Sequence, residues 1–483
     1  MKLLFVASEA YPLIKTGGLA DVAGTLPEVL RQDGLDVRLL LPAYADLLAS
    51  IDGQPAVVAE LELAGQSVRI LETHLPDTPL VTWLVDHPLF SDRPGNPYHD
   101  PLGKPWEDNP DRFMLLCRAA AQIGSGEASL RWRADVMHCN DWHTGPAIAL
   151  AKLQPDCPAS VFTIHNLAHM GLFDRETFDR LGLPEHLWGD QALEFYDHCS
   201  FMKGGLVFAD YVTTVSPGYA GEICESPGGM GLEGLLSARR DRLVGILNGI
   251  DTRTWDPSSD AYIEQRYDVE SLAAKSVNKQ ALQQAFGLAL RDDVPLLGFI
   301  GRLTEQKGLE LMLPVLEELL RLPAQLVFLG TGETVYEREL KRLAEANPGA
   351  MATVLAYNES VAHRIEAGAD IFLMPSLFEP CGLNQLYSLR YGTLPVVRAV
   401  GGLADTVVDA DEKAIADGTA TGFVFRLPTA EDFLAAVRRA CLLWREPDRW
   451  RGLQLRGMAQ DFSWHQSAER YRALYREAIN LER

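Results

Sequence analysis

Long apolar stretches are absent from the 483-residue sequence. No window offers the roughly 18 or more uninterrupted apolar residues that a membrane-spanning helix needs. The first apolar run, residues 3–7, is too short for the apolar region of a signal peptide, and it leads into Ser8 and Glu9 without a small-residue cleavage site. We therefore expect no membrane partner and interpret this run as a first core strand.

Paired cysteines are also lacking. The seven cysteines are odd in number, scattered, and never spaced as CxxC. This spacing argues against a disulfide framework and against a cysteine-based zinc site, and it favours a reducing cytoplasm as the location.

Basic residues are scarce, with 44 Lys and Arg against 66 Asp and Glu and a net charge of −22. Nucleic acids and anionic membranes both need a basic footprint, so neither is expected as a partner. A neutral polymer such as a glucan suits this charge better. An anionic ligand would need a local cationic pocket, which directs attention to basic residues beside glycine loops.

The composition, 47% hydrophobic and 23% charged, is that of a folded protein too long for one core. Short apolar runs alternate with helix-length amphipathic stretches, which predicts open α/β sheets of buried parallel strands. The runs fall at 3–7, 37–41, 136–139, 161–164 and 211–215, and then at 296–300, 326–329, 352–356, 371–374 and 395–397.

The two series of strands predict two domains that separate near residues 248–251, where a strand-like run ends in turn residues. Ligands of open α/β sheets bind beyond the carboxyl ends of the strands, so a cleft between the domains is the expected site. The pentapeptide Gly-Gly-Leu-Ala-Asp occurs at 17–21 and again at 401–405, each time at the start of a predicted helix.

The first chemical motif is Lys-Thr-Gly-Gly-Leu-Ala-Asp-Val at 15–22. Paired glycines let backbone N–H groups approach a phosphate at a helix N-terminus, and Lys15 adds a positive charge. The alternative is a tight turn from strand to helix. No GxGxxG fingerprint is present here, which disfavours a dinucleotide-dependent oxidoreductase.

Two histidines follow strands, His143 within Asn-Asp-Trp-His at 140–143 and His165 within Thr-Ile-His-Asn at 163–166. Neither has the spacing of a metal ligand, so no metal is expected. Hydrogen bonding to sugar hydroxyls is the functional interpretation, and a satisfied structural histidine is the alternative.

Two further motifs lie in the second half. Arg302 and Lys307, within residues 301–308, offer a two-pronged donor and a mobile charge for a leaving phosphate. The alternative is two solvated loop cations. Glu379 precedes Pro380 and could hold two neighbouring sugar hydroxyls; the alternative is a carboxylate that caps a helix whose first residue is Pro380.

Taken together and in this order, the motifs resemble those of bacterial glycogen synthases and plant starch synthases over nearly the whole chain. The Lys15 motif is the most specific. The others are at 93–98 (Arg-Pro-Gly-Asn-Pro-Tyr), 141–143, 162–167, 248–251, 302–304 with 306–308, 379–383 and 401–406.

The resemblance implies the GT-B fold: two Rossmann-like α/β domains with a cleft between them and a C-terminal helix that crosses back to the first domain. The expected boundaries are 1–248 for an acceptor-side domain with part of the donor site, 249–460 for a nucleotide-sugar domain, and 461–483 for the returning helix. It also implies a hexosyltransferase that moves glucose from ADP-glucose to glycogen or a maltooligosaccharide, with retention of configuration and with neither metal nor cofactor.

By the same resemblance, the diphosphate would be held by Arg302 and Lys307, with Lys15 and Gly18 completing its site. The glucosyl unit would be positioned by His165, Asp141 and Glu379, and the nucleotide base would stack on Tyr357. The remaining expected substrate-binding residues are Asp21, Tyr98, His143, Asn166, Asn248, Cys381, Gly382, Leu383 and Asn384. Retention by front-face attack is favoured over a covalent glycosyl-enzyme.

Some positions depart from the family pattern. His169 and Met170 stand where Tyr-Gln is usual, Asn384 replaces a Thr or Ser, and Val400 replaces a Thr. Other functions stay open: another retaining GT-B glucosyltransferase, such as a sucrose-forming or trehalose-related enzyme, or an inactive glucan-binding protein on the same fold. The presence of Lys15 and of the charged residues in the second half argues against the inactive form.

Overall fold

The structure is a computed structural model that describes residues 1–51, 53–356 and 358–481. The chain forms two compact units, one of residues 1–249 with 464–483 and the other of residues 250–463. Both are α/β units built on a largely parallel sheet, which confirms the predicted fold class.

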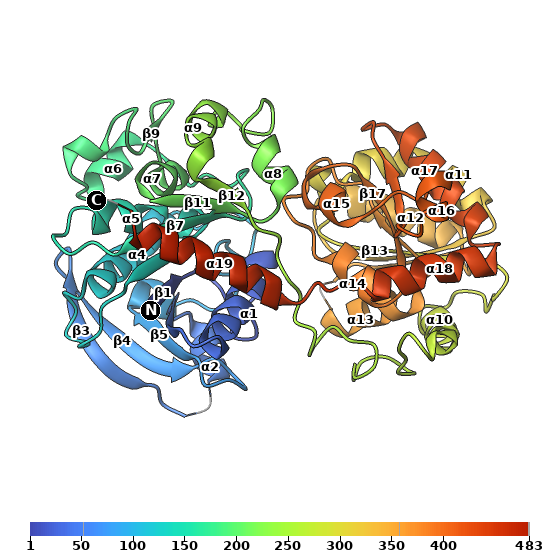
Figure 1. The fold of residues 1–483 in the computed structure, drawn as a ribbon, viewed down its shortest axis with the longest axis horizontal. Helices are drawn as coiled ribbons and strands as arrows, with labels where there is room; N and C mark the ends of the chain where they lie inside the picture. The colour runs from blue at the N-terminus through green and yellow to red at the C-terminus, as the bar shows by residue number, and fades with distance from the viewer. Residues whose placement is uncertain (52, 357, 482–483) are drawn as a thin grey trace. The chain divides into compact units, whose positions relative to one another are not determined.

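Unit 1 is built on a nine-stranded sheet of order β12-β11-β7-β6-β1-β2-β5-β4-β3 (Figure 1). The strands are β1 (Lys2–Val6), β2 (Asp36–Pro42), β3 (Ala56–Leu63), β4 (Gln66–His74), β5 (Val81–Asp86), β6 (Val136–Asn140), β7 (Ala159–Ile164), β11 (Tyr211–Thr214) and β12 (Leu243–Gly245). All neighbours pair in parallel except at the β3–β4–β5 edge, which is antiparallel. A small separate sheet has the order β8-β10-β9, with β8 at Leu172–Phe173, β9 at Glu194–Phe195 and β10 at His198–Ser200.

The helices of unit 1 cover both faces of its main sheet. They are α1 (Gly18–Gln32), α2 (Ala45–Ser50), α3 (Pro88–Ser91), α4 (Asn109–Ser125), α5 (Gly145–Ala151), α6 (Arg175–Arg180), α7 (Phe201–Phe208), α8 (Pro217–Glu222), α9 (Glu233–Ala238) and α19 (Trp464–Ile479). Although α19 comes last in the chain, it packs beside α1 and β7 and buries Tyr471 and Tyr475 in the core of unit 1 (Figure 1). The Tyr475 hydroxyl lies 2.7 Å from Nδ1 of His138 on β6, so a buried polar contact also holds this helix.

Unit 2 has a six-stranded, fully parallel sheet of order β15-β14-β13-β16-β17-β18. The strands are β13 (Leu296–Ile300), β14 (Gln325–Leu329), β15 (Met351–Val354), β16 (Ile371–Met374), β17 (Leu394–Arg398) and β18 (Phe423–Phe425). The helices are α10 (Lys275–Ala285), α11 (Leu309–Arg321), α12 (Thr334–Ala346), α13 (Glu359–Gly368), α14 (Asn384–Arg390), α15 (Gly401–Thr406), α16 (Glu412–Ala416), α17 (Ala430–Leu443) and α18 (Pro447–Met458).

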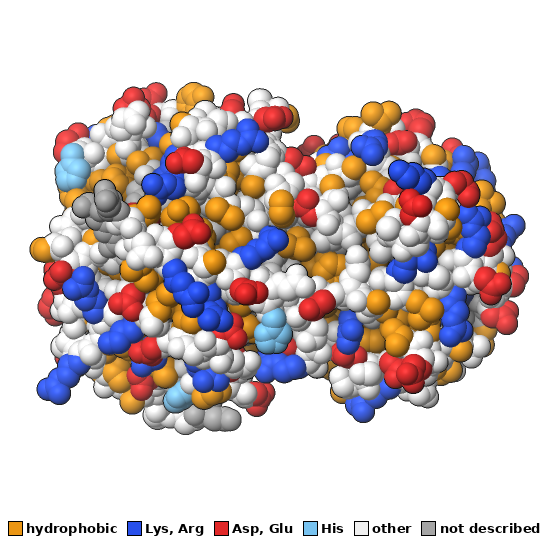
Figure 2. Space-filling view, viewed as in Figure 1, with side chains coloured by type: hydrophobic (Ala, Val, Ile, Leu, Met, Phe, Trp, Pro, Cys, Tyr) orange, Lys and Arg blue, Asp and Glu red, His pale blue; other side chains and the backbone are white. Residues whose placement is uncertain are grey.

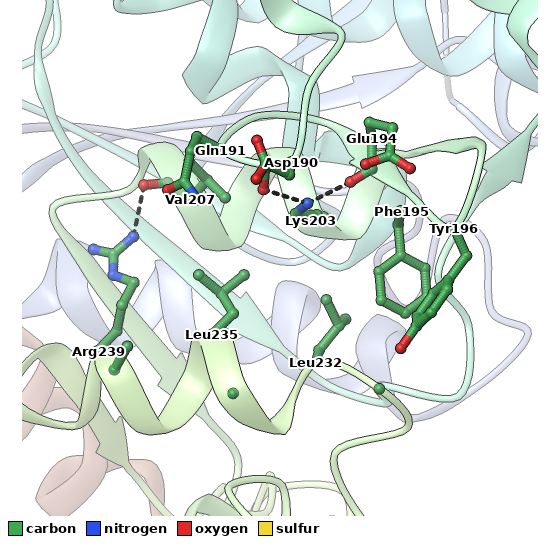
Figure 3. A pocket seen from close by; sticks show the side chains of 13 residues that line it. Asp190, Gln191, Glu194, Phe195, Tyr196, Lys203, Val207, Leu232, Leu235 and Arg239 are labelled. Carbon is green, nitrogen blue, oxygen red and sulfur yellow. Dashed lines mark hydrogen bonds between the residues drawn. The ribbon is translucent and has the colours of Figure 1, made fainter.

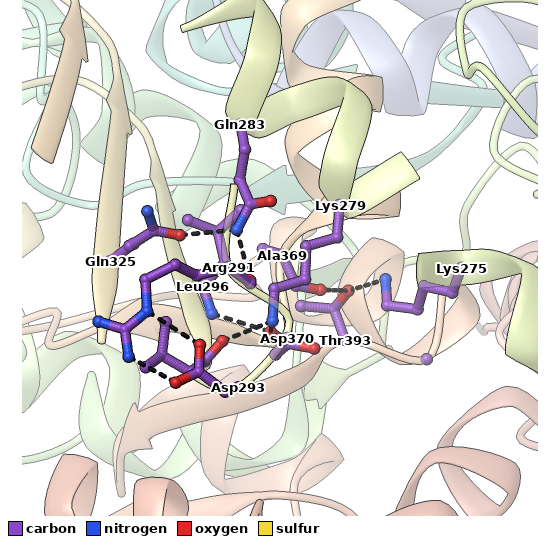
Figure 4. Close-up of polar contacts among 12 residues, drawn as sticks. Lys275, Lys279, Gln283, Arg291, Asp293, Leu296, Gln325, Ala369, Asp370 and Thr393 are labelled. Carbon is purple, nitrogen blue, oxygen red and sulfur yellow. Dashed lines mark hydrogen bonds and ion pairs between the residues drawn. The ribbon is translucent and has the colours of Figure 1, made fainter. Parts of the chain in front are cut away.

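Two buried lysines attach α10 to the rest of unit 2 (Figure 4). Lys275 donates from Nζ to the carbonyl of Ala367 at 2.8 Å and to Oγ1 of Thr393 at 2.7 Å. Lys279 forms an ion pair with Asp370 at 2.7 Å. Burial lowers the pKa of Lys275 to about 7. Because their ammonium groups are used in the core, these lysines are structural.

The surface mixes charges of both signs. Lys and Arg side chains are interspersed with Asp and Glu over the face in Figure 2. Within the described ranges, no helix is long and apolar enough to cross a membrane.

Candidate functional site

Apart from Tyr98 and Asn248, the candidate residues of unit 1 lie after the carboxyl ends of three neighbouring parallel strands. Because β7, β6 and β1 are adjacent in the sheet, the segments that follow them meet at one edge. Lys15, Gly18 and Asp21 follow β1, Asp141 and His143 follow β6, and His165 and Asn166 follow β7.

The glycine motif opens α1 as predicted, since the helix begins at Gly18. Its N-cap residue, Gly17, has no side chain that could cap the first N–H groups of this 15-residue helix. A helix N-terminus of this kind can bind an anion. Lys15 lies beside it, with Nζ 3.0 Å from Oδ1 of Asp21 and 5.3 Å from the centroid of the Tyr11 ring.

Asp141 is a buried carboxyl on a strained backbone. Its φ of 57° and ψ of 177° fall in a region that only glycine adopts easily, and such strain concentrates at functional sites. Oδ1 accepts the backbone N–H groups of His165 at 2.7 Å and Asn166 at 3.4 Å. Burial nevertheless raises the pKa of Asp141 to about 7. The strain and these two hydrogen bonds fix its carboxyl beside the segment that follows β7.

Neighbouring side chains set the protonation of His165. Asn140 is fully buried, and its Nδ2 donates to the carbonyl of Val6 at 3.0 Å. Its Oδ1 therefore faces Nε2 of His165 at 3.0 Å, and only a protonated Nε2 can form that hydrogen bond. Burial lowers the pKa of His165 to about 3, so the ring is a neutral Nε2–H tautomer with Nδ1 as its acceptor.

Glu9 joins this group, and it was not predicted from the sequence. It is buried after β1, and Oε2 accepts the N–H of Thr16 at 2.5 Å, so it ties the glycine motif to the strand end. Burial raises the pKa of Glu9 to about 7, and the negative charges of Asp21 and Asp141 add to the shift. Its position directly after a buried strand is the signal that could have identified it.

His143 is part of a cluster of aromatic side chains. It is buried and stacks on Tyr98 and Trp142, with ring centroids 4.6 and 4.1 Å apart. The Tyr98 hydroxyl in turn lies 2.7 Å from Oγ of Ser8. Nδ1 of His143 and Oδ1 of Asn248 are buried without a hydrogen-bond partner in the part of the chain that the structure describes. Two unsatisfied polar atoms are thus left among the candidate residues.

In unit 2, Lys307 and Glu379 form one polar cluster. Nζ of Lys307 lies 2.6 Å from Oε2 of Glu379, and the Ser376 hydroxyl donates to the same oxygen at 2.9 Å. Glu379 is only 6% exposed, whereas Lys307 keeps more of its side chain accessible. Lys307 is therefore ion-paired and only partly accessible to solvent.

Arg302 remains accessible. Its side chain is exposed and makes no hydrogen bond or ion pair with any residue that the structure describes. Asn384 donates through Nδ2 to the carbonyl of Ile300 at 2.8 Å, which ties the start of α14 to the end of β13. Tyr357, the expected base-stacking residue, lies outside the described residues.

The segment after β16 is a loop and not a helix start. Because α14 begins at Asn384, the alternative that Glu379 and Pro380 open a helix is wrong. Gly382 has a φ of 71°, which glycine adopts without strain. The side chain of Gln385 holds the loop by donating to the carbonyls of Cys381 at 3.0 Å and Gly382 at 2.9 Å. Cys381 is buried, and Leu383 is half-buried.

Known proteins resemble both units. Residues 2–238 match the family described as starch synthase catalytic domain, and residues 282–452 match glycosyl transferases group 1. A glycogen synthase of Methylococcus capsulatus is 52% identical over 99% of this chain and 97% of its own. A glycogen synthase of Cellvibrio japonicus is also 52% identical, over 98% of each chain.

Solved structures agree with the sequence comparisons. The catalytic domain of starch synthase IV from Arabidopsis thaliana, bound to ADP and acarbose, superposes with a TM-score of 0.89 at 30% identity over 99% of each chain. A sucrose-phosphate synthase from Thermosynechococcus elongatus shares the fold, with a TM-score of 0.60 at 17% identity. These matches confirm the resemblance that the motifs indicated: the chain is a glycosyltransferase and belongs to the glycogen and starch synthase family.

Proposed function

We propose that this glycosyltransferase is a glycogen synthase that transfers glucose from ADP-glucose to the non-reducing end of an α-1,4-glucan, with retention of configuration and release of ADP. The 52% identical glycogen synthases and the starch synthase solved with ADP and acarbose support this proposal. The observation that carries it is the Lys307–Glu379 pair. It brings together, after two neighbouring strands, a cation and a buried carboxylate that can accept hydrogen bonds from sugar hydroxyls.

Arg302 and Lys307 are the proposed ligands of the diphosphate. Negative charge grows on the β-phosphate as ADP leaves, so cations at this position stabilise the transition state more than the bound substrate. Lys15 and the uncapped helix start at Gly18 are the proposed further phosphate ligands, since both favour an anion. Asn384 is proposed to contact the phosphate, and Tyr357 is proposed to stack on the nucleotide base.

Glu379, Asp141 and His165 are the proposed positioning groups of the glucosyl unit. A carboxylate with a free lone pair accepts sugar hydroxyls, and the neutral His165 ring offers Nδ1 as an acceptor. Because burial raises the pKa of Asp141 to about 7, this carboxyl repels a nearby diphosphate less than a fully ionised one would. The other proposed sugar contacts are Asp21, Tyr98, His143, Asn166, Asn248, Cys381, Gly382 and Leu383.

Front-face attack is the proposed route by which the configuration at the anomeric carbon is retained. The acceptor hydroxyl approaches the anomeric carbon on the side from which ADP departs, and its proton passes to the leaving β-phosphate. This route needs no covalent glycosyl-enzyme, so Glu379 keeps a positioning role. In this scheme unit 1 supplies acceptor contacts, unit 2 holds the nucleotide, and a reducing cytoplasm suits the seven cysteines, all of which are thiols.

The test is glucose transfer onto glycogen from ADP-glucose and UDP-glucose, side by side and without added metal. Transfer from ADP-glucose alone is expected. Transfer from UDP-glucose alone would overturn the assignment of ADP-glucose as the donor. If a folded sample transfers glucose from neither donor, the proposed activity is overturned. Arg302→Ala should reduce turnover by about 10²-fold or more while glycogen binding persists. Arg338→Ala, an exposed arginine on α12, is the matched control.

A further inference from the structure

The second copy of the pentapeptide Gly-Gly-Leu-Ala-Asp, at 401–405, packs against the loop that carries Glu379. This loop comprises residues 375–383, between β16 and α14, and the second copy opens α15. The N–H of Gly402 donates to the backbone carbonyl of Glu379 at 3.1 Å. A Cβ on Gly402 would lie 2.1 Å from the carbonyl oxygen of Cys381, so only glycine fits at this position. The second copy therefore supports the far part of the loop through its backbone.

Arg398, the last residue of β17, holds the first part of the same loop. Its Nε donates to the carbonyl of Ser376 at 2.9 Å, and its Nη2 donates to the carbonyl of Leu377. A guanidinium presents its N–H donors in a fixed planar fork, so one side chain holds two successive peptide units. Because β17 pairs with β16 in the sheet, Arg398 lies beside the point where the loop leaves β16.

The two peptide units held in this way contact both sides of the Lys307–Glu379 pair. The Ser376 hydroxyl donates to Oε2 of Glu379 at 2.9 Å. The N–H of Leu377 donates at 2.9 Å to the carbonyl of Gln306, which precedes Lys307 in the chain. A displacement of these peptide units would therefore move the carboxylate and the cation relative to each other.

We propose that Arg398 is a positioning residue for glucose transfer, which sets the place of the Glu379 carboxylate and its distance from Lys307. In this role it acts through the two loop carbonyls and not on the substrate. The inference rests on the proposed function for the roles of Glu379 and Lys307. A displacement of about 1 Å in a site can reduce turnover about 10²-fold, so the loss of this support should be measurable in kcat.

Steady-state kinetics of Arg398→Ala and Arg398→Lys test the proposal, with the sugar donor that wild-type protein uses. We expect Arg398→Ala to reduce kcat by about 30- to 100-fold. KM for the donor should change by less than about threefold, because Arg302 and Lys307 are retained. A lysine ammonium lacks the fork and can hold one of the two carbonyls, so Arg398→Lys should be about tenfold faster than Arg398→Ala. Wild-type kcat in Arg398→Ala would overturn the proposal.

A double variant distinguishes positioning of Glu379 from a general weakening of the fold. If Arg398 acts through Glu379, adding Arg398→Ala to Glu379→Gln should slow transfer by at most about threefold, since residues that act as a unit are not additive. Multiplication of the two single losses would overturn the proposal. If Arg398→Ala does not fold, Arg398→Lys takes its place in the same comparison.

Arg239→Ala is the matched control. Arg239 lines a pocket of unit 1 and, like Arg398, donates to backbone carbonyls, among them that of Val207 at 2.8 Å (Figure 3). Its loss should lower the melting temperature about as much as the loss of Arg398, because carbonyls are left unpaired in both variants. The control should keep wild-type kcat. An equal fall of kcat in the two variants would overturn the proposal, because the effect would then not be local.

A crystal structure of each Arg398 variant separates this proposal from the proposed function. The distance from Nζ of Lys307 to Oε2 of Glu379 should increase from 2.6 Å to beyond about 3.5 Å in Arg398→Ala. If wild-type protein transfers no glucose, the proposed function is overturned and this distance still decides the role of Arg398. An unchanged loop and an unchanged pair in both variants would overturn the positioning role, whatever wild-type protein transfers.

Discussion

Nζ of Lys307 lies 2.6 Å from Oε2 of Glu379, although the two residues are 72 positions apart in the sequence. Lys307 precedes α11 after β13, and Glu379 follows β16, the neighbour of β13 in the sheet. Without a ligand, each side chain neutralises the other. In the proposed function, a diphosphate that draws Lys307 toward itself would release Glu379 for sugar hydroxyls, and the pair would couple the two halves of the nucleotide sugar.

Removal of either partner should reduce transfer strongly. We expect Lys307→Ala and Glu379→Gln each to reduce kcat for glucose transfer by about 10²–10³-fold, because each removes a charged group from the proposed transition-state contacts. Initial rates with ADP-glucose and glycogen measure this. The matched control is Lys341→Ala, at an exposed lysine of α12, which should retain wild-type rates. Wild-type rates in Lys307→Ala would remove this cation from the mechanism.

Gly308 should tolerate no side chain. Its φ is 74°, and a Cβ there would lie 1.9 Å from the carbonyl oxygen of Pro375. We therefore expect Gly308→Ala to lower the free energy of unfolding by about 2–4 kcal/mol and to displace Lys307. Urea denaturation of the full chain measures the change.

Gly287→Ala is the control for backbone strain alone. Gly287 has a similar φ of 67°, but nothing lies within 4 Å of its added Cβ. The free energy of unfolding of Gly287→Ala should be only about 1 kcal/mol lower than that of wild type. Equal losses in the two variants would show that the contact with Pro375 is unimportant.

Asn140→Asp should make His165 titrate. A carboxylate facing Nε2–H favours the imidazolium, so the pKa of His165 should rise from about 3 toward the neutral range. NMR of ¹⁵N-histidine-labelled protein reports the ring protonation directly. Wild-type His165 should stay neutral from pH 5 to 8, and the variant should gain protons as the pH falls.

The same variant should lose activity most at low pH, because the protonated ring can no longer accept a hydrogen bond at Nδ1. Asn480→Asp, at an exposed position of unit 1, is the control and should leave the His165 signal unchanged. A His165 signal in Asn140→Asp that is the same as wild type would refute the assigned tautomer.

Glu9 should make the protein less stable as the pH rises. Its pKa is raised by burial from 4.5 to about 7, so the folded state holds a proton that the unfolded state loses between those values. The stabilising contribution is complete below pH 4.5 and is lost as the pH rises through about 7. Glu9→Gln removes this dependence, so the stability difference between variant and wild type should grow by about 1–3 kcal/mol across that window.

Denaturation at a series of pH values from 4.5 to 8 measures this change. Asp141, with its pKa also raised to about 7, should keep a similar slope in the Glu9→Gln protein. Glu60→Gln, at an exposed position on β3, is the control. Its curve of stability against pH should run parallel to that of wild type. Parallel curves for Glu9→Gln and wild type would show that folding does not raise the pKa of this carboxyl.

Much of the fold could be predicted because buried parallel strands are nearly continuous apolar runs. Each of the ten predicted runs overlaps a strand of the structure. The β3–β4 hairpin was missed because its exposed and buried residues alternate at the edge of the sheet, so no apolar run marks it. The short β18 was missed for lack of length. The sheet of unit 1 is consequently mixed, and not fully parallel as the apolar runs indicated.

The sequence by itself determined the family and the chemical types at the candidate positions, because glycines, cations and carboxylates at strand ends are local features that a linear motif records. Only the tertiary structure decided the protonation states and the pairings. The neutral ring of His165, the raised pKa values of Glu9 and Asp141, and the 2.6 Å pair of Lys307 with Glu379 all depend on burial and on neighbours distant in the chain. Desolvation and distance act through space, so no local pattern of residues encodes them.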